Sequence, residues 1–191
     1  MTSKTLIAVF LALSSSQVRA GEESFSIDPN HTKPLFEVNH LGFSTQRGRF
    51  NETSGVIRLD RAQHHGSVNF VIKTDSIDMG LQKWDDHMKS DAFFNVAKYP
   101  EVVFTSSDFV FQGDLPVEAK GALTLLGVTR PISLKIQGFN CGEHPILKKP
   151  LCAANIETTL KRSEFGLTQY LPGVGDEVHV LVPVEAFKND P

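Results

Sequence analysis

Short stretches of alternating apolar and other residues run through most of this chain and constrain its fold more than any other feature. Near the C-terminus, Val178, Val180, Val182 and Val184 recur at every second position. The same period of two occurs over 67–73 and 132–137, and 101–111 and 121–126 are also strand-like. Successive side chains of a strand point to opposite faces, so this pattern indicates half-buried strands. Several short strands joined by Gly- and Pro-containing turns predict an all-β sandwich or barrel.

One segment departs from the period of two. Over 80–90, Leu81, Trp84 and Met88 fall at helical spacing, which predicts a short helix with one apolar face. Trp84 and Met88 then either pack as a lid on the core or contact a ligand directly. The two interpretations are compatible if the barrel is hollow.

The first 20 residues resemble an export signal. A basic start is followed by an apolar run over 6–13, a break at three serines and small residues at Val18 and Ala20. This layout is typical of a secretory signal peptide and too short for a membrane-spanning helix. The alternative is an apolar N-terminal strand. We expect cleavage after Ala20, one mature domain over 21–191 and a periplasmic location.

The charge of the mature chain argues against a polyanionic partner. Cleavage removes two of the 19 basic side chains and no acid, which leaves 17 against 22 acidic ones, a formal charge of −5. Nucleic acid is therefore not an expected partner. No later stretch is apolar and long enough for stable membrane insertion, and a homodimer is left open.

Cys141 and Cys152 are the two cysteines of the chain, and they frame a loop that contains Pro145 and Pro150. A disulfide here would clamp the base of a loop between strands and contribute about 2–3 kcal/mol in the chain-entropy model. The rival reading is a redox or metal pair with His144. It lacks a C-x-x-C motif and a fourth ligand at a recognisable spacing.

Phenylalanine dominates the aromatic residues, with 14 Phe against 2 Tyr and 1 Trp. Buried Phe brings large apolar area without a polar atom that needs a partner. A barrel lined by Phe would be dry and suited to an alkyl or isoprenoid chain. The alternative is that these residues simply fill a core.

The sequence contains none of the common catalytic templates, whether nucleophile elbow, zinc-protease motif, phosphate-binding loop or dinucleotide fingerprint. The seven histidines lack chelating spacing, so we expect no metal and no cofactor. Asp85, Asp86 and His87 could form an acid–base cluster, but acids at a helix start more often complement the helix dipole. We therefore expect no catalytic residues and no enzyme.

Several segments resemble the YceI-like family in order and spacing. The first match covers 38–44 and 48–50, and the second covers 85–95, 98–100 and 104–106. The third covers 121–131, and the last covers 162–166 and 176–178. The resemblance covers about residues 25 to 187. The chain departs from plainer members in its Cys141–Cys152 loop, where others have a Gly-rich or charged insertion, and in Met88, where Leu is usual. The loop could alter the barrel mouth and the choice of head group.

The resemblance implies a lipocalin-like, extended antiparallel β-barrel with a short covering helix. It also implies an exported protein that holds a long-chain apolar molecule, such as a polyisoprenoid, an isoprenoid quinone or a fatty-acid derivative. The matching segments place a set of Phe residues on or near the barrel walls, two residues on the covering helix and three polar residues near a head group. The wall residues are Phe43, Phe50, Phe104 and Phe165, and the helix residues are Trp84 and Met88. The polar residues near the head group are His40, Asp85 and His87.

The sequence thus predicts a periplasmic carrier or binding protein for an apolar chain. Each methylene group removed from water contributes about 0.8 kcal/mol, so few polar contacts are needed. Two alternatives stay open: an enzyme that acts on such a lipid, and a stress- or adhesion-related protein whose barrel is filled by its own side chains.

Overall fold

The computed structural model describes residues 21–190, so the predicted signal peptide and its cleavage site lie outside the described residues. The elements are β1 Glu23–Ile27, β2 Leu35–His40, β3 Ser44–Phe50, β4 Thr53–Asp60, β5 His65–Lys73, η1 Thr74–Ser76, β6 Ile77–Asp78, α1 Gln82–Lys89, β7 Glu101–Gln112, β8 Leu115–Leu125, β9 Val128–Glu143, β10 Pro150–Lys161, η2 Arg162–Phe165 and β11 Val174–Lys188. Within this part of the chain, no helix has the length and apolarity that crossing a bilayer requires.

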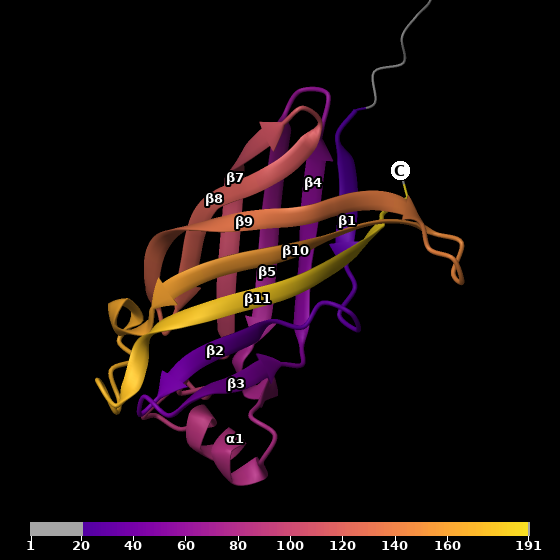
Figure 1. The fold of residues 1–191 in the computed structure, drawn as a ribbon. Coiled ribbons are helices and arrows are strands. Elements are labelled where there is room, and N and C mark those ends of the chain that lie inside the picture. Colours follow the sequence, from indigo (N-terminus) through magenta and orange to yellow (C-terminus); the bar gives the residue numbers. More distant parts are fainter. Residues whose placement is uncertain (1–20, 191) are drawn as a thin grey trace, which may run out of the picture.

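Eight antiparallel strands close into a barrel (Figure 1). Their order is β1-β4-β5-β7-β8-β9-β10-β11, and β11 returns to β1 through the pairing of Ile27 with Ala186. The first half of β11 pairs instead with β2, from which β3 and β6 continue the wall. This confirms the all-β fold that the alternation predicted and the lipocalin-like barrel that the resemblance implied, with α1 covering one end.

A buried threonine closes the gap where β1 leaves β11. The Thr32 hydroxyl donates to the carbonyl of Glu185 at 3.1 Å and accepts from its N–H at 3.0 Å. Thr32 is fully buried, so its hydroxyl satisfies the Glu185 N–H and adds to the bond that the Glu185 carbonyl accepts from the Asp28 N–H. The wall therefore stays continuous although the chain turns away.

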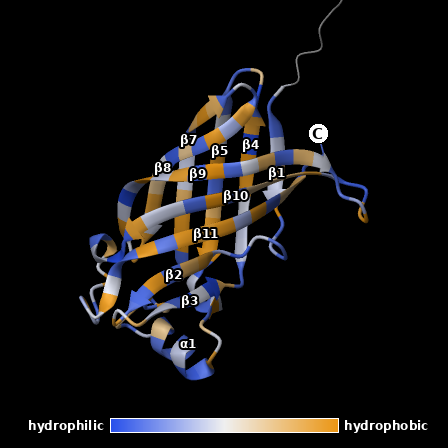
Figure 2. Cartoon of the chain, in the orientation of Figure 1, coloured by the Kyte–Doolittle hydropathy of each residue, from blue (hydrophilic) through white to orange (hydrophobic). Residues whose placement is uncertain are grey.

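The alternation in the sequence becomes an inside and an outside in the barrel. Orange and blue alternate along the strands in Figure 2. In β11, Val178, Val180 and Val182 face the interior, as the period of two predicted. The predicted helix is present as α1, where Met88 packs against the main core cluster.

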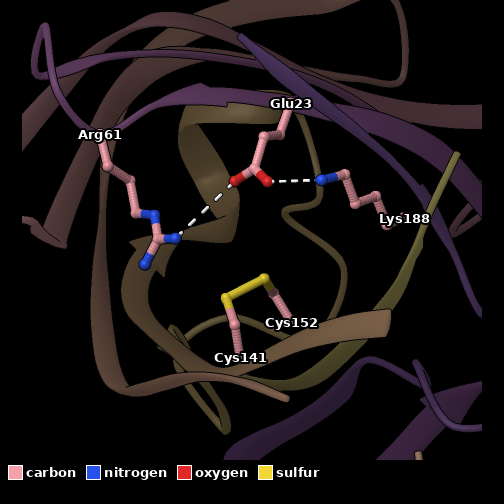
Figure 3. Close-up of a disulfide and its surroundings, with 5 residues drawn as sticks. All are labelled: Glu23, Arg61, Cys141, Cys152 and Lys188. Atoms are coloured by element: carbon pink, nitrogen blue, oxygen red, sulfur yellow. Dashed lines mark hydrogen bonds and ion pairs between the residues drawn. A yellow bond between two sulfur atoms is a disulfide. The ribbon is translucent and has the colours of Figure 1, made fainter. Parts of the chain in front are cut away.

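The predicted disulfide is present and joins two long strands. Cys141 of β9 and Cys152 of β10 are register partners, with sulfurs 1.98 Å apart and Cα atoms 4.0 Å apart. Figure 3 shows the bridge beside Glu23, whose carboxylate contacts Lys188 at 2.6 Å and Arg61 at 3.8 Å. The bridge thus clamps the β9–β10 hairpin where the first and last strands meet.

Candidate functional site: an apolar cavity in the barrel

The barrel interior holds a cavity of about 420 Å³ that is lined almost entirely by apolar side chains. Nearly every strand of the wall contributes to the lining, and α1 and the segment before β11 complete one end. A concave, mostly apolar site of this size is typical of a small-molecule pocket. Among the described residues that line it, none is acidic.

A second cavity of about 110 Å³ lies toward the opposite end of the barrel interior. The two cavities share five lining residues: Phe70, Phe104, Leu134, Ile156 and Val182. We call these five the dividing wall. A ligand chain longer than the first cavity must displace or pass this wall to enter the second.

The ring of Phe104 in the dividing wall is held by a glycine on the neighbouring strand. A Cβ atom at Gly121 would lie 2.7 Å from Cζ of Phe104 and 2.2 Å from the backbone oxygen of Thr105. Only glycine leaves room for this approach. Phe104 is 4% exposed, so its position in the wall is fixed by close packing on both sides.

Aromatic rings form much of the wall near α1. Phe50 packs edge-on against Phe94, with ring centroids 5.4 Å apart, and tilted against Phe36 at 5.9 Å. All three rings line the larger cavity. Because Phe carries no polar atom, this region stays dry without any partner for hydrogen bonds.

The polar lining residues lie mainly at the end that α1 covers. His40 ends β2 and pairs with Val174, while His87 of α1 lies 3.4 Å from the Tyr170 hydroxyl. Tyr170 and Val174 belong to the same loop, since the Val174 N–H donates to the carbonyl of Tyr170. The few polar side chains of the lining therefore gather mainly at one end, while the cavity surface itself is almost entirely apolar.

Arg162 is the one buried cation among the described lining residues, and it organises this loop. Its guanidinium donates four hydrogen bonds of 2.6–3.0 Å to backbone carbonyls, those of Leu167, Gln169, Val174 and Gly175. Burial lowers its pKa, and the charge of Asp176 partly opposes that shift. Five N–H groups are available on the guanidinium, so one remains for another acceptor.

Six of the nine predicted site residues line the cavity: His40, Phe50, Trp84, His87, Met88 and Phe104. Trp84 is 45% exposed, so it lies at the edge of the opening and not deep in the barrel. Their roles in binding remain predictions.

The structure places the other three predicted residues elsewhere. Phe43 follows the turn between β2 and β3 and is 91% exposed, so its placement on the barrel wall was wrong. Phe165 is 1% exposed but packs in the core outside the cavity lining. Asp85 accepts a 2.6 Å hydrogen bond from the Met79 N–H, which fastens the start of α1 and turns the carboxylate away from a head-group role.

The disulfide-clamped hairpin also lies away from the polar end. Cys152 lines the smaller cavity together with Phe25, Ile27 and Ala186. In Figure 1 the hairpin between β9 and β10 projects on the side opposite the β2–β3 turn. The loop therefore lies at the end of the barrel away from α1, beside the smaller cavity, and its effect on the choice of head group stays a prediction.

A cluster that sequence reasoning missed joins the segment after β1 to β11. The ligating atoms of Asp28, His31 and Glu185 lie within 4.8 Å of one another, with His31 Nδ1 2.6 Å from Asp28. The hydrogen bond that the His31 ring donates to Asp28, aided by the charges of Asp28 and Glu185, raises the pKa of His31. The 2.6 Å contact makes His31 and Asp28 a hydrogen-bonded pair, which is an ion pair when the imidazole is protonated.

The pKa of Asp28 reflects two opposing effects. Burial raises it, but hydrogen bonds from His31 and from the N–H of Asn30 outweigh burial, so the pKa is lowered overall. The His31–Asp28 spacing of three residues was the only sign in the sequence, because Glu185 joins through the barrel closure.

Comparisons with known proteins agree with this architecture. A family model described as "YceI-like domain" matches residues 25–186. A UPF0312 protein of Pectobacterium atrosepticum is 31% identical over 98% of this chain and 99% of its own length. Protein YceI of Salmonella arizonae is 31% identical over 88% of each chain.

Solved structures share the fold. BcnA of Burkholderia cenocepacia superposes with a TM-score of 0.71 at 20% identity, covering 83% of this chain and 98% of that one. A polyisoprenoid-binding domain from Saccharophagus degradans gives a TM-score of 0.64 at 18% identity, covering 86% and 98%. With the family match over nearly the whole barrel, the chain belongs to the YceI-like family.

Proposed function

We propose that this protein is a periplasmic carrier that holds one long apolar chain inside its barrel. The observation that carries the proposal is the 420 Å³ cavity with an apolar lining and no acidic residue among its described members. The expected signal peptide supports export. The Saccharophagus relative, described as a polyisoprenoid-binding domain, supports an isoprenoid or a similar chain as cargo.

Burial of the chain supplies the affinity. Each methylene contributes about 0.8 kcal/mol, so about ten of them contribute roughly 8 kcal/mol before the entropic cost of association. Shape, rather than hydrogen bonding, then selects the cargo. Quinone, fatty-acid and isoprenoid chains differ mainly in branching and in the head group.

The head group would lie at the polar end, near Arg162. The remaining N–H of that guanidinium can donate to a carbonyl, carboxylate or phosphate oxygen, and His40 and His87 line the same end. A charged donor in a dry site makes a stronger hydrogen bond than one in water. We therefore propose a cargo with an oxygen acceptor at one end.

Binding accounts for the geometry better than catalysis does. Of the acids in the segment first considered for acid–base chemistry, Asp85 accepts from the Met79 N–H and Asp86 accepts from Gln82 at 2.8 Å. Both carboxylates serve the helix. The alternative of a barrel filled by its own side chains is disfavoured by the open volume at its centre.

Titration of the purified protein with a short-chain quinone analogue, such as decylubiquinone, tests the proposal. Trp84 lines the cavity and is the only tryptophan, so its fluorescence should change as the ligand enters. Binding should show a negative heat-capacity change and little salt dependence. No saturable signal with decylubiquinone, palmitate or a polyprenol would refute the proposal.

A further inference from the structure

Large apolar side chains are exposed around the opening of the cavity. Phe43 is 91% exposed, Leu41 56%, Tyr170 53% and Trp84 45%. We call these four residues the apolar rim. A soluble protein seldom gathers such side chains on one surface unless that surface contacts something apolar.

The rim is contiguous although its residues come from three segments. The Leu41 N–H donates to the carbonyl of Gly173 at 2.7 Å, which joins the β2–β3 turn to the segment before β11. The same two segments lie side by side in Figure 1. On the other side, the Tyr170 ring lies 6.0 Å from Phe93 and from His87 of α1.

Two rim residues occupy backbone positions that do not suit them. Leu41 and Gly42 have φ of 55° and 73°, and the Phe43 N–H donates to the His40 carbonyl, which makes a β-turn with both central φ values positive inside the three-residue loop between β2 and β3. Such turns favour Asn, Asp or Gly. Tyr170 also has a positive φ, of 63°. An exposed Leu at such a position has both a conformational and a solvation cost, so fold stability does not explain it.

The rim also surrounds the route by which a ligand would leave. Trp84 and Tyr170 line the cavity and are exposed at the same time, so they lie where the cavity meets the surface. Tryptophan and tyrosine are enriched at membrane–water interfaces, because their rings are apolar with one polar group. An apolar cargo that is nearly insoluble in water resides in a bilayer.

We propose that the apolar rim docks on the surface of a lipid bilayer, so that the cavity opens toward the acyl chains. The inference rests on the proposed carrier function and adds where the cargo is exchanged. The cavity mouth and the rim form one continuous apolar surface, which a bilayer covers without exposing the cargo to water. The contact is peripheral, since only side chains from two loops and α1 enter the interface.

The charges of α1 indicate which bilayers the rim can use. Lys83 and Lys89 are balanced by Asp85 and Asp86 within the same helix. The helix itself therefore offers anionic lipid no net attraction, and the contact depends on apolar insertion. Zwitterionic phosphatidylcholine should suffice as the partner surface.

Flotation with phosphatidylcholine vesicles tests the proposal with two matched double variants. The first is Leu41→Asn with Phe43→Ser, which removes two exposed apolar residues that do not line the cavity. Asn suits the positive φ at position 41, so the turn and fold should be kept. The control is Ile146→Ser with Leu147→Ser, which removes 82% and 55% exposed residues from the disulfide-clamped hairpin.

Wild type and the hairpin control should float with vesicles, and the rim variant should partition roughly tenfold or more weakly. Equal flotation of all three proteins, or no flotation of wild type, would overturn the proposal. So would a rim variant that changes only self-association, because the rim would then be an interface between copies or with a protein partner.

A second measurement separates this proposal from the carrier function. The rim variant should bind decylubiquinone added from solution as wild type does, because its cavity lining is intact. If vesicles bind but no ligand enters the cavity, the carrier function fails and the docking surface stands. If ligand binds equally in all proteins and vesicles do not discriminate them, the docking surface fails alone.

Discussion

Phe104→Ala should extend the length of chain that the barrel accepts while it weakens the empty protein. Phe104 is 4% exposed and belongs to the wall between the two cavities. Truncation of a buried Phe costs about 3–5 kcal/mol of unfolding free energy. The same truncation opens the dividing wall to the second cavity of about 110 Å³.

The gain for a longer ligand follows from that volume. An apolar cavity of about 150 Å³ takes up a benzene ring, so the second cavity takes a shorter stretch, on the order of four carbons. Each contributes about 0.8 kcal/mol, which totals about 3 kcal/mol or roughly 200-fold in affinity. In wild type, affinity for saturated fatty acids should rise about fourfold per methylene and then level off at the wall. In the variant the rise should continue.

Phe165→Ala is the matched control, since Phe165 is 1% exposed and lines neither cavity. It should lose similar stability in chemical denaturation but keep the wild-type dependence on chain length in calorimetric titrations. Identical length profiles for Phe104→Ala, Phe165→Ala and wild type would refute the reasoning that Phe104 limits the cargo.

Three further outcomes follow from individual contacts. Cys141→Ser with Cys152→Ser should lower the free energy of unfolding in denaturant by about 2–3 kcal/mol and leave the affinity for decylubiquinone nearly unchanged. A loss of binding without a loss of stability would contradict a purely structural disulfide. Arg162→Met should lower the free energy of unfolding by about 3 kcal/mol and loosen the loop before β11, because four carbonyls lose a buried donor. Faster hydrogen exchange in that loop would show the loosening, and unchanged protection would contradict it. The raised pKa of His31 means that the folded state binds a proton more tightly than the unfolded state, so its contribution to stability is full below about pH 6.5 and lost as the pH rises through the raised value. His31→Ala should remove that step from the pH dependence of the melting temperature, and an unchanged step would exclude the ion pair with Asp28.

The barrel could be predicted from sequence because the alternation of buried and exposed side chains is visible within each strand. An inward position must be apolar at every second residue, so the valines of β11 reveal both the strand and its buried face. The covering helix was predictable for the same reason, since Trp84 and Met88 recur at helical spacing. The disulfide followed from two cysteines at the ends of a short loop.

Side chains outside that pattern could not be placed. Phe43 and Phe165 are phenylalanines near strands, as the wall residues Phe50 and Phe104 are. However, Phe43 lies in a turn and Phe165 in a 3₁₀ segment, where the alternation of a strand no longer gives the direction of the side chain. Arg162 acts through carbonyls that come together only when the loop before β11 folds. Such contacts depend on register and closure, which a period of two does not encode.

The ion pair at the barrel closure shows the same limit at longer range. His31 and Asp28 are close in sequence, but Glu185 meets them only because β11 returns to β1. The division of the interior into two cavities also depends on several strands together. Both features depend on the pairing of strands far apart in the sequence, so they required the structure.

The carrier claim is tested most directly by what the protein holds when it is purified from its own host. Protein purified from the periplasm of its host, without detergent, would be weighed by native mass spectrometry and then extracted with organic solvent. The account predicts a mass above that of residues 21–191 by one apolar molecule per chain, recovered in the extract and carrying an oxygen-bearing head group. Protein with the bare mass, no lipid in the extract and no uptake of added quinone or fatty acid would contradict it.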